Sequence, residues 1–105
     1  MAQKLLKREF DAALDTGTLP MVLDFYADWC GPCRMQEPQF RLAEAELKGR
    51  AEFFKVDIED QPELAARFEV MSIPTIVVVK GGQPRWRSVG VTGKDEIVQA
   101  VRAVL

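Results

Sequence analysis

The sequence contains no histidine among its 105 residues, and this absence excludes several kinds of catalytic and metal site. Neither a Ser–His–Asp triad nor a Cys–His pair can form, and no imidazole is present to bind a metal ion. Cysteine is also scarce, since the chain has only Cys30 and Cys33. A zinc site needs four ligands, so these two thiols would require a dimer or added carboxylates to complete one. We therefore expect no metal.

Long apolar runs and clusters of basic residues are missing as well. The longest apolar stretches, such as residues 75–79, are far shorter than the roughly 20 residues that span a bilayer. The first ten residues contain no apolar core of the kind found in a secretory signal, so we expect a cytoplasmic protein. The 14 Lys and Arg residues are interspersed with 16 Asp and Glu residues. This pattern argues against binding to nucleic acid or to a membrane surface.

What the sequence does contain is an alternation of strand-like and helix-like segments. Its 48% apolar content is typical of globular proteins, and its length predicts a single domain over residues 1–105. Short apolar and β-branched runs predict strands. Apolar residues at helical spacing, with Pro or Gly near the ends, predict helices. The expected strands are 21–27, 52–58, 75–80 and 84–89, and the expected helices are 33–48, 62–68 and 93–105.

The connections between these segments indicate how the sheet is built. Gly81 and Gly82 predict a tight turn, so the last two strands pair antiparallel as a hairpin. Within the first twenty residues we favour a brief strand at 4–6 followed by a helix. Together the segments predict an α/β fold, in which a central mixed β-sheet of four to five strands is flanked by helices on both faces.

The two cysteines lie three residues apart, at the junction between a predicted strand and a predicted helix. A bridge over four residues closes almost no loop, so its value is chemical rather than mechanical. Free backbone N–H groups at a helix start stabilise negative charge, so Cys30 is expected to be the attacking thiolate. Gly31 and Pro32 shape the turn that lets Cys33 reach back to Cys30 and resolve a mixed disulfide.

Asp24 is the candidate proton acceptor for Cys33. It stands within an apolar strand, where desolvation is expected to raise the pKa of its carboxyl group toward neutrality. Lys55, which lies within another apolar strand, is its expected partner, although a lysine at a strand edge often extends to water.

Several motifs in order along the chain now support a family resemblance. Around the cysteines the sequence reads Asp-Phe-Tyr-Ala-Asp-Trp-Cys-Gly-Pro-Cys-Arg over residues 24–34. With the motifs that follow it, this segment resembles the active-site region of the thioredoxin family, and the likeness runs through nearly the whole chain. The further motifs are Pro38, Lys55-Val56-Asp57, Ile73-Pro74-Thr75 and Val89-Gly90.

The resemblance implies a thioredoxin fold and a protein dithiol–disulfide oxidoreductase. In the family, a cis proline corresponding to Pro74 lies against the cysteine pair, so Ile73, Pro74, Gly90 and the neighbouring Trp29 are implied to bind substrate. Disulfide-containing proteins would be the substrates, and an NADPH-linked thioredoxin reductase would supply electrons. A monomer without a bound cofactor is expected.

Two alternatives remain open. The fold also serves as a binding or assembly module in which redox chemistry is dispensable, but such a scaffold has no need to keep Cys30, Cys33, Asp24 and Pro74 together. A specialised oxidant would have a reduction potential well above the roughly −270 mV typical of thioredoxin. The Gly-Pro dipeptide between the cysteines is the form found in reducing members.

Three positions depart from the commoner family pattern. Tyr26 stands where a tryptophan is frequent. Residues 7–9 lack the usual Ser, Thr or Asp cap before the first helix. Trp86 is unusually large for the last strand, and we interpret it as a half-buried edge residue rather than a partner contact.

Overall fold

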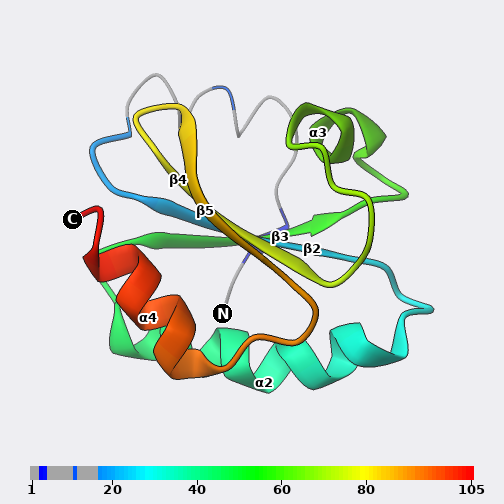
Figure 1. Ribbon diagram of the computed structural model, residues 1–105, viewed down its shortest axis with the longest axis horizontal. Coiled ribbons are helices and arrows are strands. Elements are labelled where there is room, and N and C mark those ends of the chain that lie inside the picture. Colours follow the sequence, from blue (N-terminus) through cyan, green and yellow to red (C-terminus); the bar gives the residue numbers. More distant parts are fainter. Residues whose placement is uncertain (1–2, 5–10, 12–16) are drawn as a thin grey trace.

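The computed structural model describes residues 3–4, 11 and 17–105 of the chain. From β2 (Met21–Tyr26) onward, strands and helices alternate until the closing hairpin and helix (Figure 1). No helix within these described residues is both long and apolar enough to cross a membrane. The elements are β1 (Gln3–Lys4), β2 (Met21–Tyr26), α2 (Gly31–Glu46), β3 (Glu52–Asp57), α3 (Pro62–Arg67), β4 (Thr75–Lys80), β5 (Gln83–Val89) and α4 (Lys94–Arg102).

The five strands form one mixed sheet in the order β1-β3-β2-β4-β5. β2 lies at its centre, parallel to β3 and antiparallel to β4. β4 and β5 form the expected hairpin, and both turn glycines have positive φ values, 61° for Gly81 and 78° for Gly82. Positive φ is strained for other residues, which explains why two glycines occur there. The prediction of a mixed sheet of four to five strands is confirmed.

Helices cover both faces of the sheet, as expected. In Figure 1, α2 and α4 lie together below the sheet and α3 lies above it. Side chains alternate along each strand, so Val22 and Ile76 pack toward α2 and α4, whereas Leu23 and Val77 pack toward α3. The two faces thus bury two separate apolar clusters, which hold β2 between them.

The element boundaries differ slightly from those expected. The helix predicted at 33–48 begins at Gly31, because Cys30 caps it, and the last helix is shorter than predicted, at 94–102. Pro38 lies inside α2. Trp86 is partly buried against the cluster that lies between the sheet and the helices α2 and α4, in agreement with the interpretation as an edge residue. Of the strand expected at 4–6, Lys4 lies in β1 (Gln3–Lys4). Residues 5–6, the uncapped segment 7–9 and all but residue 11 of the segment expected to be helical lie outside the described residues.

Candidate active site

Cys30 is the N-cap residue of α2, with an extended backbone (φ −86°, ψ 111°). The backbone N–H of Cys33 donates to the Cys30 Sγ over 3.2 Å. Pro32 stands in the first turn, where its missing N–H leaves no donor unpaired. Gly31 is exposed, and a β-carbon there would meet no atom within 4 Å. The Cys30 sulfur therefore faces the positive end of the helix, where negative charge is favoured.

The two cysteines are joined by a disulfide, with their Cα atoms 5.3 Å apart. Both are almost buried, with exposed fractions of 4% for Cys30 and 6% for Cys33. They belong to a small apolar cluster at one end of the sheet. Because both residues are so little exposed, only a small part of the disulfide is accessible to a partner protein. The other members of the cluster are Tyr26, Ala27 and the partly buried Ile58 and Ile73.

Asp24 lies in the middle of β2, on the face that α2 covers, since it is two residues from Val22. Its side chain is 1% exposed, and neither carboxylate oxygen has a hydrogen-bond partner among the described residues. Burial raises the pKa of Asp24 from 3.8 to about 7; the charge of Lys55 opposes this rise and that of Glu37 adds to it. The carboxyl group therefore titrates near neutral pH, as its place in an apolar strand predicted.

Lys55 is the register partner of Asp24 in the neighbouring parallel strand. We expected its ammonium group to pair with Asp24, but it forms an ion pair and hydrogen bond with Glu37 of α2. The Nζ atom also lies 4.2 Å from the centroid of the Tyr26 ring.

The expectation of a direct Lys55–Asp24 pair is therefore wrong. Glu37 is 29% exposed, so an ion pair formed with it loses less hydration than one formed with the buried Asp24. Lys55 still lowers the pKa of Asp24 through its charge, without a hydrogen bond.

A pocket of about 240 Å³ opens beside Cys33. Lys55 and Glu37 line it together, and the second carboxylate oxygen of Glu37 lies 3.3 Å from the Nε of Arg41. A space of this size holds several water molecules, so water can reach the surroundings of Cys33 from this side. The remaining lining residues are Tyr26, Ala27, Asp28 and Arg34.

A second pocket, of about 300 Å³, lies beside Trp29 and is largely apolar in its side chains. Trp29 is 65% exposed, and its indole N–H donates to the Glu59 Oε2 over 3.1 Å. Met71, which also lines the pocket, is 92% exposed. Large apolar side chains grouped in solvent are typical of an interaction surface, and here they adjoin the disulfide. The pocket is lined by Trp29, Ile58, Ala65, Val70, Met71, Ser72 and Ile73.

The other residues implied to bind substrate meet at the same end of the sheet. The Ile73–Pro74 peptide bond is cis, as the resemblance implied. The carbonyl of Pro74 accepts a hydrogen bond from the Gly90 N–H over 2.9 Å, which joins the start of β4 to the end of β5. Ile73 packs against the cysteine cluster, so these segments adjoin the disulfide.

Sequence reasoning did not identify Glu37 or Glu59 as part of this site. Glu37 follows Cys33 by four residues, a spacing that places both on one helix face and was the available signal. Glu59 gave no such signal, because only the turn after β3 brings it to Trp29. Within residues 3–4, 11 and 17–105, no group of three Cys, Asp or Glu side chains is arranged to hold a metal ion.

Comparison with known proteins adds independent findings. The family model for thioredoxin matches residues 1–103. The chain is 42% identical over 101 residues to thioredoxin 1 of Chlorobaculum tepidum, covering 96% of this chain and 95% of that protein. It is 38% identical over 98 residues to a thioredoxin of Staphylococcus aureus, covering 93% of this chain and 92% of that protein. The solved structure of Fasciola hepatica thioredoxin superposes with a TM-score of 0.85 at 28% identity, covering 98% of both chains.

Proposed function

We propose roles for individual residues from one premise: the chain belongs to the thioredoxin family and is a dithiol–disulfide oxidoreductase. Cys30 is the attacking thiolate and Cys33 the resolving thiol. The observation that carries this order is the Cys33 N–H, which donates to the Cys30 Sγ at the start of α2. That contact and the helix terminus favour negative charge on Cys30.

In the first step the Cys30 thiolate attacks one sulfur of a disulfide in a partner protein. The partner's S–S bond breaks, its other sulfur leaves as a thiolate and takes a proton from water, and a mixed disulfide joins Cys30 to the partner. No electrons leave the two proteins, since one disulfide replaces another.

In the second step Cys33 loses its proton to the carboxylate of Asp24 and attacks the Cys30 sulfur. The mixed disulfide breaks, and the partner's second sulfur leaves as a thiolate that is protonated from water. The partner has gained two electrons and two protons in total, and the chain holds the Cys30–Cys33 disulfide. A pKa of about 7 suits Asp24 to this exchange. The pocket beside Cys33 brings water to Lys55 and Glu37, whose charges act on Asp24.

Partner proteins dock, in this proposal, on the surface around Trp29. The apolar pocket between Trp29 and Ile73 takes side chains next to the disulfide, and Ile73, Pro74 and Gly90 offer backbone to an extended segment. A thioredoxin reductase that draws on NADPH would return the electrons. We place the protein in the cytoplasm as a monomer. The comparisons do not favour the alternative of a binding module without redox chemistry.

Reduction of insulin, followed by turbidity, tests the proposed roles. The wild-type protein is expected to be active, Cys30→Ser inactive, and Cys33→Ser inactive with a mixed disulfide to insulin that survives on a non-reducing gel. Met35→Ala, on the same helix and 67% exposed, serves as the matched control and should keep full activity. A trapped complex with Cys30→Ser instead of Cys33→Ser would reverse the assigned order.

A further inference from the structure

Gln36 is a polar residue on the buried face of α2, one helical turn beyond Cys33. Its side chain is fully buried, and it forms two hydrogen bonds with the backbone of a single residue, Thr92. The Gln36 Nε2 donates to the Thr92 carbonyl over 2.9 Å, and the Thr92 N–H donates to the Gln36 Oε1 over 2.7 Å. One amide thus satisfies both polar backbone groups of a residue that is itself 2% exposed.

Thr92 belongs to the loop between β5 and α4, which also contains Gly90. The Thr92 hydroxyl lies within hydrogen-bond distance of both the Ser88 hydroxyl, at 2.7 Å, and the Gly90 carbonyl, at 3.1 Å. The Gly90 N–H donates to the Pro74 carbonyl over 2.9 Å. Gly90 has a φ of 92°, so glycine is required for the path of the loop. A continuous series of hydrogen bonds therefore runs from the helix of Cys33 through Gln36 and Thr92 to Pro74.

The choice of glutamine at this position needs an explanation beyond packing. The neighbouring buried residues on this face of α2, Phe40 and Ala43, are apolar. A buried amide costs free energy unless its groups are paired, and an apolar side chain of the same size would fill the space but leave the buried N–H and carbonyl of Thr92 without these partners. What an apolar residue would not do is fix Thr92 at a set distance from the cysteine helix.

The geometry points to Gln36 as a positioning residue that holds the Gly90–Thr92 loop against α2 and thereby sets the affinity for protein disulfides. This inference rests on the proposed function, in which Ile73, Pro74 and Gly90 receive the backbone of a partner protein. A small disulfide makes no such backbone contacts. Loss of the Gln36–Thr92 contact should therefore weaken reaction with a protein substrate and spare reaction with a small one.

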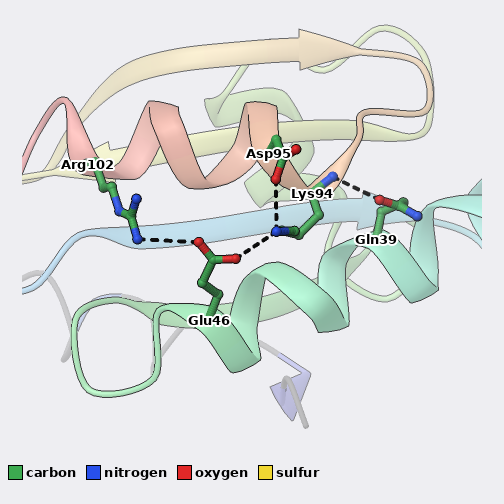
Figure 2. Close-up of polar contacts among 5 residues, drawn as sticks. All are labelled: Gln39, Glu46, Lys94, Asp95 and Arg102. Carbon is green, nitrogen blue, oxygen red and sulfur yellow. Dashed lines mark hydrogen bonds and ion pairs between the residues drawn. The ribbon is translucent and has the colours of Figure 1, made fainter.

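Gln39 supplies a matched control one turn further along α2. Its Oε1 accepts a hydrogen bond from the Lys94 N–H over 2.9 Å, at the first residue of α4 (Figure 2). Gln39 therefore also fastens a backbone group to α2 through its amide, but beyond the loop that contains Gly90. The variants Gln36→Met and Gln39→Met remove the same chemical group from the same helix.

The experiment follows oxidation of the fully reduced protein in a single turnover, with insulin at rising concentration or with 5,5′-dithiobis(2-nitrobenzoic acid) as the small disulfide. For Gln36→Met we expect the half-saturating insulin concentration to rise about fivefold or more, as when the net contribution of one or two hydrogen bonds is lost. The limiting rate with insulin and the rate with the small disulfide should stay within about twofold of wild type. Gln39→Met should match wild type in every reaction.

An unchanged half-saturating insulin concentration in a folded Gln36→Met protein would overturn the inference, as would equal slowing with both disulfides. Gln36→Asn, shorter by one methylene group, withdraws the amide from Thr92 and replaces the methionine variant if that variant does not fold. Failure of the wild-type protein to reduce insulin at all would instead refute the proposed function, so the two failures are distinguishable.

Discussion

At the scale of single residues, Asp24 occupies a position where an apolar side chain would be more stable. The folded protein keeps a proton on Asp24 up to pH about 7, whereas the unfolded chain releases it near pH 3.8. Between these pH values the unfolded state binds fewer protons than the folded state, so the free energy of unfolding falls as pH rises and levels off above about 7. The cost of keeping this carboxyl group buried is thus felt at neutral and alkaline pH.

Asp24→Asn removes this ionisation. The difference in free energy of unfolding between the variant and wild type should grow in favour of the variant by up to about 4 kcal/mol from pH 4 to pH 8, because each pKa unit corresponds to about 1.4 kcal/mol. Urea unfolding of the oxidised proteins at both pH values measures the difference. A gap between the two proteins that does not widen with pH would show that Asp24 ionises normally in the folded state.

Glu37 gives a second prediction at this scale. Its negative charge raises the pKa of Asp24 directly, and its ion pair holds Lys55, whose positive charge lowers that pKa. Glu37→Gln removes the negative charge that raises the pKa of Asp24. It also leaves the positive charge of Lys55 without the Glu37 carboxylate that partly neutralises it, so both changes should move the pKa of Asp24 below about 7. The chemical shift of the Asp24 carboxyl carbon, followed against pH in the oxidised protein, measures this directly.

The control for Glu37→Gln is Glu46→Gln on the same helix. Glu46 pairs with Lys94 and Arg102 of α4 (Figure 2), so its replacement also removes one negative charge and its ion pairs. It lies nine residues further along α2, about 13 Å from Glu37 along the helix axis. The Asp24 titration should not move in this variant, and an equal shift in both variants would rule out a specific effect of Glu37.

At the scale of elements, α2 connects the cysteine pair to the hydrophobic core. It begins at the cysteine pair and packs further along against the sheet through Phe40, which is fully buried and meets Phe53 edge to face at 5.1 Å between ring centroids. Phe40→Ala should lower the free energy of unfolding by about 3–5 kcal/mol, because it leaves a cavity between helix and sheet. Chemical denaturation measures this loss.

Met35→Ala is the matched change on the exposed face of the same helix. It should alter the free energy of unfolding by less than about 0.5 kcal/mol, since surface substitutions away from special features have small effects. A comparable loss for Met35→Ala would mean that burial does not explain the loss at Phe40, because alanine is the best helix former and neither substitution lowers helix propensity.

The sequence predicted the elements better than the contacts between them. The run at 75–80 is β-branched and apolar and predicted β4 with its observed boundaries, since local composition decides such a strand. The sequence also predicted that Lys55 lies beside Asp24, and the two residues are register partners in neighbouring strands. It did not predict that the Lys55 ammonium group forms its ion pair with Glu37. That pairing depends on how α2 lies over the sheet, which no local pattern specifies.

The site shows the same division. Asp24 was identified because a carboxylate in an apolar strand is costly and needs a reason. The Gln36–Thr92 contact joins residues 56 positions apart and gave no sequence signal, because a glutamine in an amphipathic helix fits a solvent-facing position equally well.

At the scale of the whole molecule, we expect one domain that remains monomeric in both redox states. The Cα atoms have a radius of gyration of 12.2 Å, close to the roughly 13 Å expected for a single compact domain of this length. Small-angle X-ray scattering of the oxidised and reduced proteins should give nearly the same value for both. A clearly larger radius in either state, with earlier elution from a sizing column, would indicate a dimer.

The placement of the two tryptophans has an optical consequence. Trp29 stands in solvent directly before the disulfide, whereas Trp86 is partly buried in β5 against the cluster between the sheet and the helices α2 and α4. A disulfide quenches the fluorescence of an indole beside it, and the aromatic residue within the cysteine cluster is Tyr26 rather than a tryptophan. The protein therefore carries one reporter of its own oxidation state, and Trp86→Phe would leave that signal free of background.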